Sequence, residues 1–262
     1  MTDISVGSGE SREPLLRRSL LKGGIAAMFG AMVTGRAAAA GEGKKPAAGP
    51  ANAGTLLDQF AVTQVIARER LGRETHDFDL EESCFHPDAF VDVSWFSGTA
   101  KQFVEAGRRG AAAGRAGTSL KAVYFDSMSP PAVSINGDRA IADASCAVHS
   151  FSTLNGVDVH VTAYTRLLWR AVKQQGEWLI FGLRGIYIRD TLAAADPTQA
   201  LVIDQQKLAQ FRQSYRYLSY LTASGGGPTR NDRAGVDQPD TVIKLRAAER
   251  SWLAGETSAA AS

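Results

Sequence analysis

Two residues, Asn155 and Gly156, constrain the fold of this chain more than any other feature of its sequence. Asn-Gly is the strongest short signal for a two-residue β-hairpin turn, because both turn positions require a positive φ. The flanking segments, 139–151 and 157–171, are rich in apolar and β-branched residues and predict two long strands. The chain is therefore expected to contain a long antiparallel hairpin.

The turn also predicts which side chains share a face of the sheet. With a two-residue loop, Phe151 lies opposite His160, and His149 lies opposite Thr162. Because side chains alternate between faces, Tyr164 and Arg166 lie on this same face. The other face carries smaller or apolar residues, namely Ala144, Cys146, Val148, Val161, Ala163, Leu167 and Trp169.

Two interpretations of this pattern are open. In the first, the polar face lines an internal cavity, where His149 or His160 transfers a proton and Tyr164 and Arg166 stabilise an oxyanion. In the second, the polar face meets solvent and the apolar face forms the core, as in many antiparallel sheets. The predicted catalytic residues on the hairpin follow from the first interpretation, and the second interpretation stays open.

The elements around the hairpin indicate an α+β fold. Apolar residues at helical spacing predict a long helix from residue 56 to about residue 74, and shorter helices are predicted at 80–85 and 99–113. Strands are predicted at 90–96, 122–125 and 178–188, followed by a helix from 197 to about 212 and a short helix near Trp252. Helices followed by a run of consecutive strands favour an antiparallel sheet over a parallel one.

The N-terminus resembles an export signal. Arg17-Arg18 precedes a weakly apolar run and then small residues at 37–40, which is typical of a twin-arginine signal peptide and predicts a periplasmic protein. The predicted organisation is a signal peptide at 1–40, a flexible linker at 41–54, a pocket domain at 55–195 and a C-terminal helix and extended wrap at 196–262.

Charge and motifs exclude several classes of function. The 262 residues carry a formal net charge of +2, but cleavage after Ala40 would leave 24 basic and 24 acidic residues, so the basic excess gives no argument for nucleic acid. No apolar stretch reaches the length of about 20 residues that spans a bilayer. No metal-binding or nucleotide-binding motif is present, which predicts a protein without a metal or cofactor. The two cysteines, Cys84 and Cys146, are interpreted as buried side chains.

Several strings in order resemble the SnoaL-like branch of the nuclear-transport-factor-2-like superfamily. They are Cys84-Phe85-His86-Pro87-Asp88-Ala89, Ser94-Trp95-Phe96-Ser97-Gly98, Asn136-Gly137-Asp138-Arg139-Ala140, Gly176-Glu177-Trp178, Ile186-Tyr187-Ile188-Arg189-Asp190 and Tyr215-Arg216-Tyr217-Leu218. The resemblance covers roughly residues 56 to 255 and implies a cone, in which a curved antiparallel sheet is closed by N-terminal helices around a pocket. Members include scytalone dehydratase-like enzymes, isomerases, lyases acting on lignin-derived dimers and non-catalytic proteins, so the fold alone does not fix the function.

The resemblance also implies site residues. Dehydratase relatives place an acidic residue near the end of the first long helix, and Glu74 stands there in this chain, beside Arg73. The relatives' histidine usually follows the third helix, where this chain instead has Lys121, Tyr124 and Asp126. This departure puts a simple histidine–aspartate dyad in doubt.

Together these observations predict a cofactor-independent lyase that acts on a small, hydrophobic, aromatic and hydroxylated compound, with loss of water or formaldehyde. The predicted catalytic residues are His149, His160, Glu74, Tyr164 and Arg166, and the predicted substrate-binding residues are Arg73, Tyr124, Asp126, Trp95, Phe151 and Tyr187. The alternatives are an isomerase that uses the same pocket and a non-catalytic periplasmic binding protein. A homo-oligomer, either a dimer or a trimer, is also expected.

Overall fold

The computed structural model describes residues 52–115 and 123–256, which belong to one compact unit. The predicted signal peptide, nearly all of the predicted linker and Lys121 lie outside the described residues. The predicted domain boundaries, the export route and the periplasmic location therefore stay predictions.

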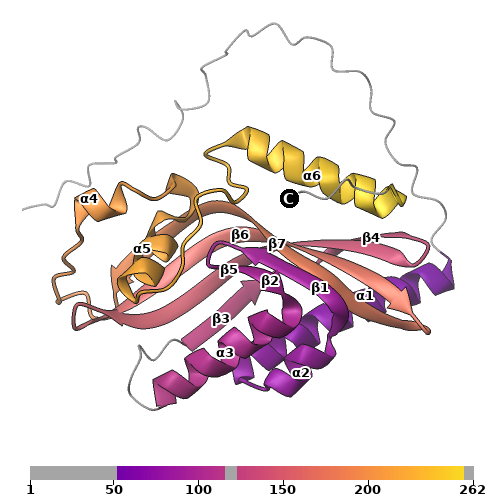
Figure 1. Ribbon diagram of the computed structural model, residues 1–262, viewed down its shortest axis with the longest axis horizontal. Coiled ribbons are helices and arrows are strands. Elements are labelled where there is room, and N and C mark those ends of the chain that lie inside the picture. Colours follow the sequence, from indigo (N-terminus) through magenta and orange to yellow (C-terminus); the bar gives the residue numbers. More distant parts are fainter. Residues whose placement is uncertain (1–51, 116–122, 257–262) are drawn as a thin grey trace, which may run out of the picture. The chain divides into compact units, whose positions relative to one another are not determined.

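A curved sheet forms the centre of the molecule (Figure 1). Its path runs β2-β1-β7-β6-β5-β3, and β4 also pairs with β5. The strands are β1 (Phe85–Val93), β2 (Phe96–Thr99), β3 (Val123–Met128), β4 (Ala132–Asn136), β5 (Arg139–Leu154), β6 (Val157–Gln174) and β7 (Glu177–Ala194). The predicted α+β architecture with a curved sheet is thus confirmed, and the sheet does not close into a barrel.

The predicted hairpin is confirmed in both its turn and its register. Asn155 and Gly156 have φ values of 51° and 80°, as a two-residue turn of this kind requires. His149 pairs with Thr162, and Phe151 pairs with His160. A second turn repeats this geometry between β6 and β7, where Gln175 and Gly176 have φ values of 54° and 88°.

Three features of the sheet differ from the sequence-based expectations. Strand β1 begins at Phe85, at the end of the helix predicted for 80–85, and therefore starts earlier than the strand predicted for 90–96. Strand β4, which directly follows Pro130 and Pro131, was not predicted. Strand β1 pairs in parallel with β7, so the sheet is mixed. Proline is tolerated at the first residues of strands, and a parallel pair needs a long connection that sequence alone does not reveal.

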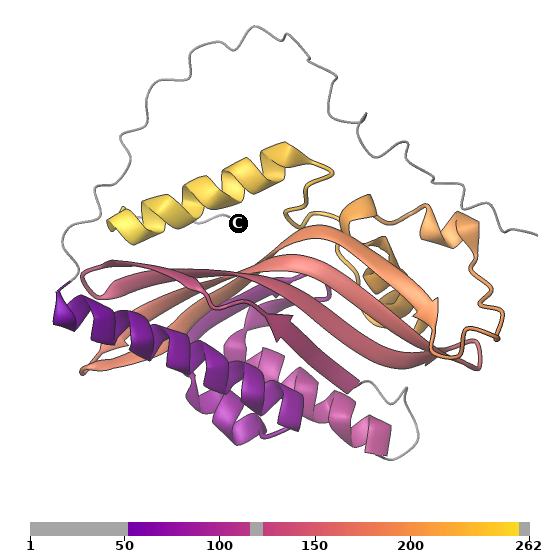
Figure 2. The ribbon, with the colours of Figure 1, turned by 180° about the vertical axis from the view of Figure 1, so that it is seen from behind.

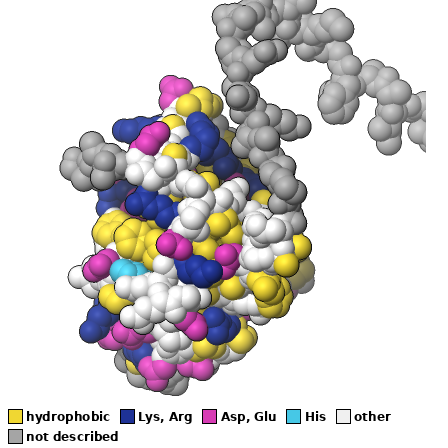
Figure 3. Space-filling model, turned by 90° about the vertical axis from the view of Figure 1, so that its right-hand side faces the viewer, with side chains coloured by type: hydrophobic (Ala, Val, Ile, Leu, Met, Phe, Trp, Pro, Cys, Tyr) yellow, Lys and Arg dark blue, Asp and Glu magenta, His cyan; other side chains and the backbone are white. Residues whose placement is uncertain are grey.

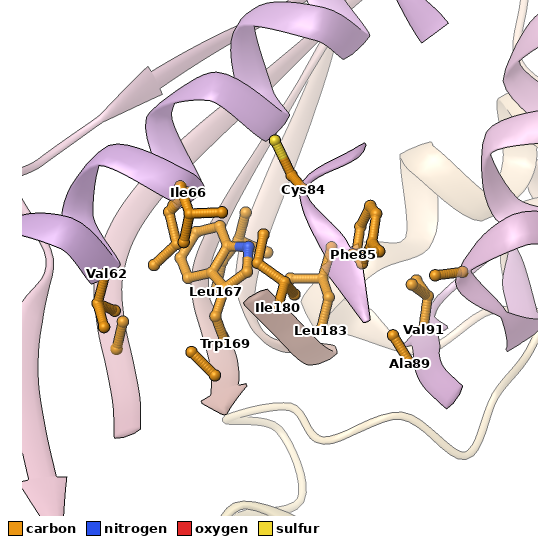
Figure 4. Packing of buried hydrophobic residues seen from close by; sticks show 14 of the residues in the cluster. Val62, Ile66, Cys84, Phe85, Ala89, Val91, Leu167, Trp169, Ile180 and Leu183 are labelled. Carbon is orange, nitrogen blue, oxygen red and sulfur yellow. The ribbon is translucent and has the colours of Figure 1, made fainter. Parts of the chain in front are cut away.

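Three helices cover the inner face of the sheet, which is the face that carries Leu167 and Trp169. They are α1 (Ala53–Thr75), α2 (Phe78–Ser83) and α3 (Ala100–Arg115). Helix α1 ends where the predicted long helix does, and α3 is preceded by Thr99, whose hydroxyl accepts the backbone N–H of Gln102 at 3.2 Å. The apolar row of α1 packs Val62 and Ile66 against Trp169 and neighbouring strand residues (Figure 4). Burying that row fixes the helix on the sheet.

The C-terminal region adds helices to both faces of the sheet. Helices α4 (Gln205–Leu208) and α5 (Arg216–Ser224) are joined by a turn of 3-10 helix at Gln213–Tyr215 and pack on the inner face against Val159 and Val161. The predicted helix over 197–212 is wrong, because only the four residues of α4 are α-helical there. Helix α6 (Pro239–Ala254) is longer than expected and lies on the opposite side of the sheet from α1 (Figure 2).

The remaining global expectations concern cysteines, membranes and charge. Cys84 and Cys146 are free and buried, as predicted. Within the described residues no helix is long and apolar enough to cross a membrane. Figure 3 shows acidic and basic side chains intermixed over the face that it presents, with apolar patches between them.

Candidate functional site

A cavity of about 290 Å³ lies between the inner face of the sheet and the helices α1, α3 and α5. This volume falls near the lower end of the range of about 300–1,000 Å³ found for small-molecule sites. Its lining is Arg70, Arg73, Glu74, Val93, Ser94, Trp95, Phe103, Tyr124, Asp126, Val148, Ser150, Ser152, Ala163, Thr165, Leu167, Leu183, Tyr187, Leu218, Leu221, Thr222, Gly225, Gly227 and Pro228. The walls are mostly apolar, and charged groups gather at the end of α1.

A buried ion cluster links α1 to β3 at this charged end. Arg70 Nε donates to Glu69 Oε2 at 2.6 Å, and Arg70 Nη1 binds Asp126 Oδ2 at 3.1 Å. Glu69 is fully buried, and the Asp126 side chain is only 6% exposed. Burial opposes the charge of Arg70, but the two carboxylates outweigh it and raise the pKa of the guanidinium. The cluster therefore holds Asp126 in a fixed position at the cavity wall.

A second carboxyl group stands beside Asp126. Glu74 Oε1 accepts the backbone N–H of Asp126 at 3.0 Å. Burial raises the pKa of Glu74, the backbone hydrogen bond lowers it, and the nearby Asp126 carboxylate raises it further. The net shift is upward, so Glu74 holds a proton more readily than an ordinary glutamate does. Two carboxyl groups in different environments are typical of paired acid and base roles.

Arg73 brings a positive charge into the aromatic part of the wall. Its Nη1 binds Glu81 Oε1 at 3.0 Å, and its guanidinium carbon lies 4.0 Å from the ring centroid of Phe103 and 5.5 Å from that of Trp95. Stacking on rings leaves several N–H donors of a guanidinium group for other partners. Arg73 does not pair with Glu69, four residues earlier on the same helix, because Glu69 pairs with Arg70 and Arg73 pairs with Glu81.

Three polar side chains among the cavity-lining residues come from positions far apart in the sequence. The hydroxyl of Tyr187 accepts the backbone N–H of Ser94 at 2.8 Å, and burial raises the pKa of this tyrosine, so it keeps its proton as a donor. Ser94 Oγ and Asp126 Oδ1 are buried and have no hydrogen-bond partner among the described residues. Unpaired buried polar atoms are costly, at about 1–3 kcal/mol each, and at functional sites they commonly meet a ligand.

The prediction that the polar face of the hairpin lines the cavity is wrong. Val148, Ser150 and Ala163 line the cavity, and strand alternation turns His149, Phe151, His160, Tyr164 and Arg166 to the outer face of the sheet. The physical reason is packing: the small apolar side chains admit the apolar rows of the covering helices, whereas imidazole and guanidinium groups would be desolvated there.

The outer-face residues have their own partners or meet solvent. Arg166 Nε donates to Asp143 Oδ1 at 2.8 Å, and the Tyr164 side chain is exposed. His149 and His160 contact each other on this outer face. Proton transfer by these histidines at the cavity is therefore not available, and no histidine is among the cavity-lining residues of the described chain.

The structure does bring together six other predicted site residues at one cavity: Arg73, Glu74, Trp95, Tyr124, Asp126 and Tyr187. Sequence reasoning missed Arg70 and Ser94. Arg70 had a usable signal, because it lies four residues after Ile66 and four before Glu74 on the same helix row. Sequence reasoning also missed the part of the lining that α5 and the loop after it contribute, because the local sequence offers no comparable pattern there.

The fold and the cavity define an α+β protein with a pocket between a curved sheet and the helices that cover it. More specifically, the chain belongs to the SnoaL-like domain family, whose model matches residues 54–184. The match ends before Tyr187 and before the helices that close the cavity from the C-terminal side.

Similarity to individual proteins extends further along the chain but is low. Pea pathogenicity protein 2 from Fusarium vanettenii is 24% identical over 230 residues, which cover 82% of this chain and 95% of the relative. A protein of unknown function from Mycobacterium tuberculosis matches with 19% identity and a TM-score of 0.41, covering 70% of this chain and 98% of that one. A hexachlorocyclohexane dehydrochlorinase matches with 10% identity and a TM-score of 0.45, covering 56% of this chain and 97% of that one.

Proposed function

We propose that the protein is a cofactor-independent lyase that removes a proton and a leaving group from a small, hydrophobic, hydroxylated compound. The observation that carries this proposal is the Asp126 carboxylate, which is buried in a mostly apolar cavity with Oδ2 bound to Arg70 and Oδ1 free of any described partner. A carboxylate that is held in a fixed position beside a bound molecule is suited to general-base catalysis. Membership of the SnoaL-like family is compatible with this chemistry.

The neighbouring groups supply the other parts of an elimination. Asp126 Oδ1 takes a proton from the carbon next to the carbinol, and the electron pair of that C–H bond forms a C=C bond. The C–O bond then breaks, and the leaving hydroxyl receives a proton from Glu74, so that water departs. Glu74 suits this role because burial raises its pKa.

Negative charge that develops on a substrate oxygen is stabilised by hydrogen-bond donors. Arg73 and Tyr187 line the same cavity and offer an N–H and an O–H group. Aromatic side chains at Trp95, Phe103 and Tyr124 suit a flat substrate. Loss of formaldehyde would use the same groups. Asp126 takes the hydroxyl proton of a hydroxymethyl group, the electron pair of that O–H bond forms the C=O bond of formaldehyde, and the C–C bond breaks. The electron pair of the C–C bond then takes a proton from Glu74 at the remaining carbon.

The test uses ultraviolet absorbance on a panel of aromatic diols with purified protein. An elimination creates new conjugation and an absorbance change, and a formaldehyde assay separates the two leaving groups. Saturable binding without any change in the ligand would favour the non-catalytic alternative and would contradict the lyase proposal.

Two variants give the first prediction. Asp126→Asn and Glu74→Gln should each lower kcat about 10²–10⁴-fold on a verified substrate, because each removes one proton-transfer group. Because Glu74 acts as the acid with a raised pKa, the wild-type rate should fall as the pH rises through that pKa, and the Glu74→Gln variant should lose this limb of the pH profile.

His160→Ala is the matched control, because it removes a titratable side chain from the outer face of the same sheet. Its rate should stay within a few-fold of the wild type. A loss in His160→Ala equal to that in Asp126→Asn would contradict the assignment of the base.

A further inference from the structure

A pair of histidines lies on the outer face of the sheet, away from the cavity. His149 on β5 stands opposite Thr162 on β6, and His160 lies diagonally next to it, opposite Phe151. Helix α6 is clamped to a different part of this face, where Glu249 binds Arg170 and Arg184. The histidine pair has no part in the proposed reaction.

Three side-chain atoms with lone pairs, two nitrogens and one oxygen, lie close together here. His149 Nδ1 and His160 Nε2 lie 3.0 Å apart. Thr162 Oγ1 lies 3.0 Å from His160 Nε2 and 3.3 Å from His149 Nδ1. Thr162 is only 5% exposed, so its hydroxyl forms the floor of a small triangle of two nitrogens and one oxygen.

Neighbouring side chains orient both rings. The other nitrogen of His149, Nε2, lies 3.1 Å from Ser127 Oγ. The ring of Phe151 stacks on His160 with centroids 4.6 Å apart, and Phe125 lies 5.8 Å from His149. A hydrogen bond to the far nitrogen is the usual support for a histidine that binds a metal, because it fixes the tautomer and the ring plane.

The tautomers of the two rings also allow a cation to bind. In a metal-bound form His149 would keep its proton on Nε2, facing Ser127, and His160 would keep its own on Nδ1. Both facing nitrogens would then be ligands.

We propose that His149, His160 and Thr162 form a surface binding site for a divalent transition-metal ion of the Cu²⁺ type. Metal–nitrogen bonds of about 2.0–2.1 Å to two nitrogens 3.0 Å apart subtend an angle of about 90–97°. That angle matches neighbouring positions of a tetragonal or octahedral ion, and it is narrower than the tetrahedral angle of a structural zinc site. Both imidazoles are partly exposed, so water can complete the coordination.

The test is a Cu²⁺ titration of the full-length protein without a polyhistidine tag, stripped of metal beforehand. We expect one Cu²⁺ site per chain by calorimetry, with nitrogen hyperfine coupling in the electron paramagnetic resonance spectrum and weaker binding of Zn²⁺. His149→Ala and His160→Ala should each weaken Cu²⁺ binding by more than about tenfold, and Ser127→Ala by about tenfold through loss of ring orientation.

His76→Ala and His86→Ala are the controls, because they remove the other two histidines of the chain. In the ranges 52–115 and 123–256 no group of three or more His, Cys, Asp or Glu side chains is arranged to hold a metal, so background binding should be weak. Far-ultraviolet circular dichroism checks folding, and His149→Gln provides a variant of similar size if the alanine variant unfolds. Binding that survives both His149 and His160 substitutions, binding that is lost equally in the controls, or no Cu²⁺ binding at all would overturn the proposal.

Discussion

At the scale of single residues, Asp190 links the sheet to the helix that closes the cavity. Its Oδ2 accepts the backbone N–H of Leu218 at 2.8 Å, near the start of α5, while Oδ1 is buried and lacks a partner among the described residues. Burial raises the pKa of Asp190 to about 6, although the hydrogen bonds from the start of α5 act in the opposite direction. The charged form of Asp190 is therefore less stable in the folded protein than in water.

The sign of the resulting pH dependence follows from linkage. A folded-state pKa above the ordinary 3.8 means that the native state binds more protons than the unfolded state between about pH 4 and 6. The contribution of Asp190 to stability is most favourable below pH 4 and decreases as the pH rises through 6. Asp190→Asn should raise the free energy of unfolding by about 1–3 kcal/mol at pH 7.5, with little difference from the wild type at pH 4.5.

Urea denaturation at the two pH values measures this effect. Asp196→Asn is the control of opposite sign, because hydrogen bonds from Thr198 lower the pKa of Asp196. An equal effect of Asp190→Asn at both pH values would show that the charge of Asp190 does not cause the difference.

At the scale of elements, α6 is held on the outer face mainly by charge. Glu249 binds Arg170 Nε at 2.7 Å and Arg184 Nη1 at 3.2 Å, joining the helix to β6 and β7. The Glu249 side chain is only 6% exposed, and Trp252 packs near Arg170 with 4.9 Å between the guanidinium carbon and the ring centroid. Removal of one partner from such a buried group leaves the other charges uncompensated.

Glu249→Gln is therefore expected to destabilise the protein by about 3 kcal/mol, since it leaves Arg170 and Arg184 without their carboxylate. Asp240→Asn, at an exposed position of the same helix, should change the free energy of unfolding by less than about 0.5 kcal/mol. Denaturant midpoints compare the two variants. A similar small change in both would mean that packing, not charge, holds α6.

At the scale of the whole molecule, the cavity is built from parts far apart in the chain. Helix α1 supplies charge, the sheet supplies an apolar wall, and α5 closes the C-terminal side with Leu218, Leu221 and Thr222. Leu221 is 7% exposed and also packs with Val159, Val161 and Tyr220 in a hydrophobic cluster. The helix that closes the cavity is therefore part of that cluster. The predicted oligomer and the predicted periplasmic location concern scales beyond this chain and stay predictions.

Leu221→Ala should lower stability by about 2–5 kcal/mol, because it removes buried methyl groups and leaves a void. It should also raise KM for a verified substrate, since the same side chain lines the cavity. Ile243→Ala on α6, where the side chain is 63% exposed, is the control and should alter neither quantity. An unchanged KM in Leu221→Ala would separate the closing helix from ligand binding.

The sequence by itself determined the central hairpin and the first long helix of this protein. Asn155-Gly156 predicted the turn, and the turn predicted the register that places His149 opposite Thr162. The helical row of α1 placed Arg73 near the end of that helix, and the family resemblance pointed to Glu74 beside it and to Tyr124 and Asp126, which lie on β3. These predictions succeeded because hydrogen bonding and side-chain alternation act over a few residues.

Only the tertiary structure decided which face of the hairpin lines the cavity. Alternation sorts side chains into two faces, but it does not say which face the helices will cover. The covering helices present apolar rows that pack against Cys146, Leu167 and Trp169, and so turn His149 and His160 outward. Burial of apolar area is a property of both partners together, and for this reason no single segment of the sequence contains the answer.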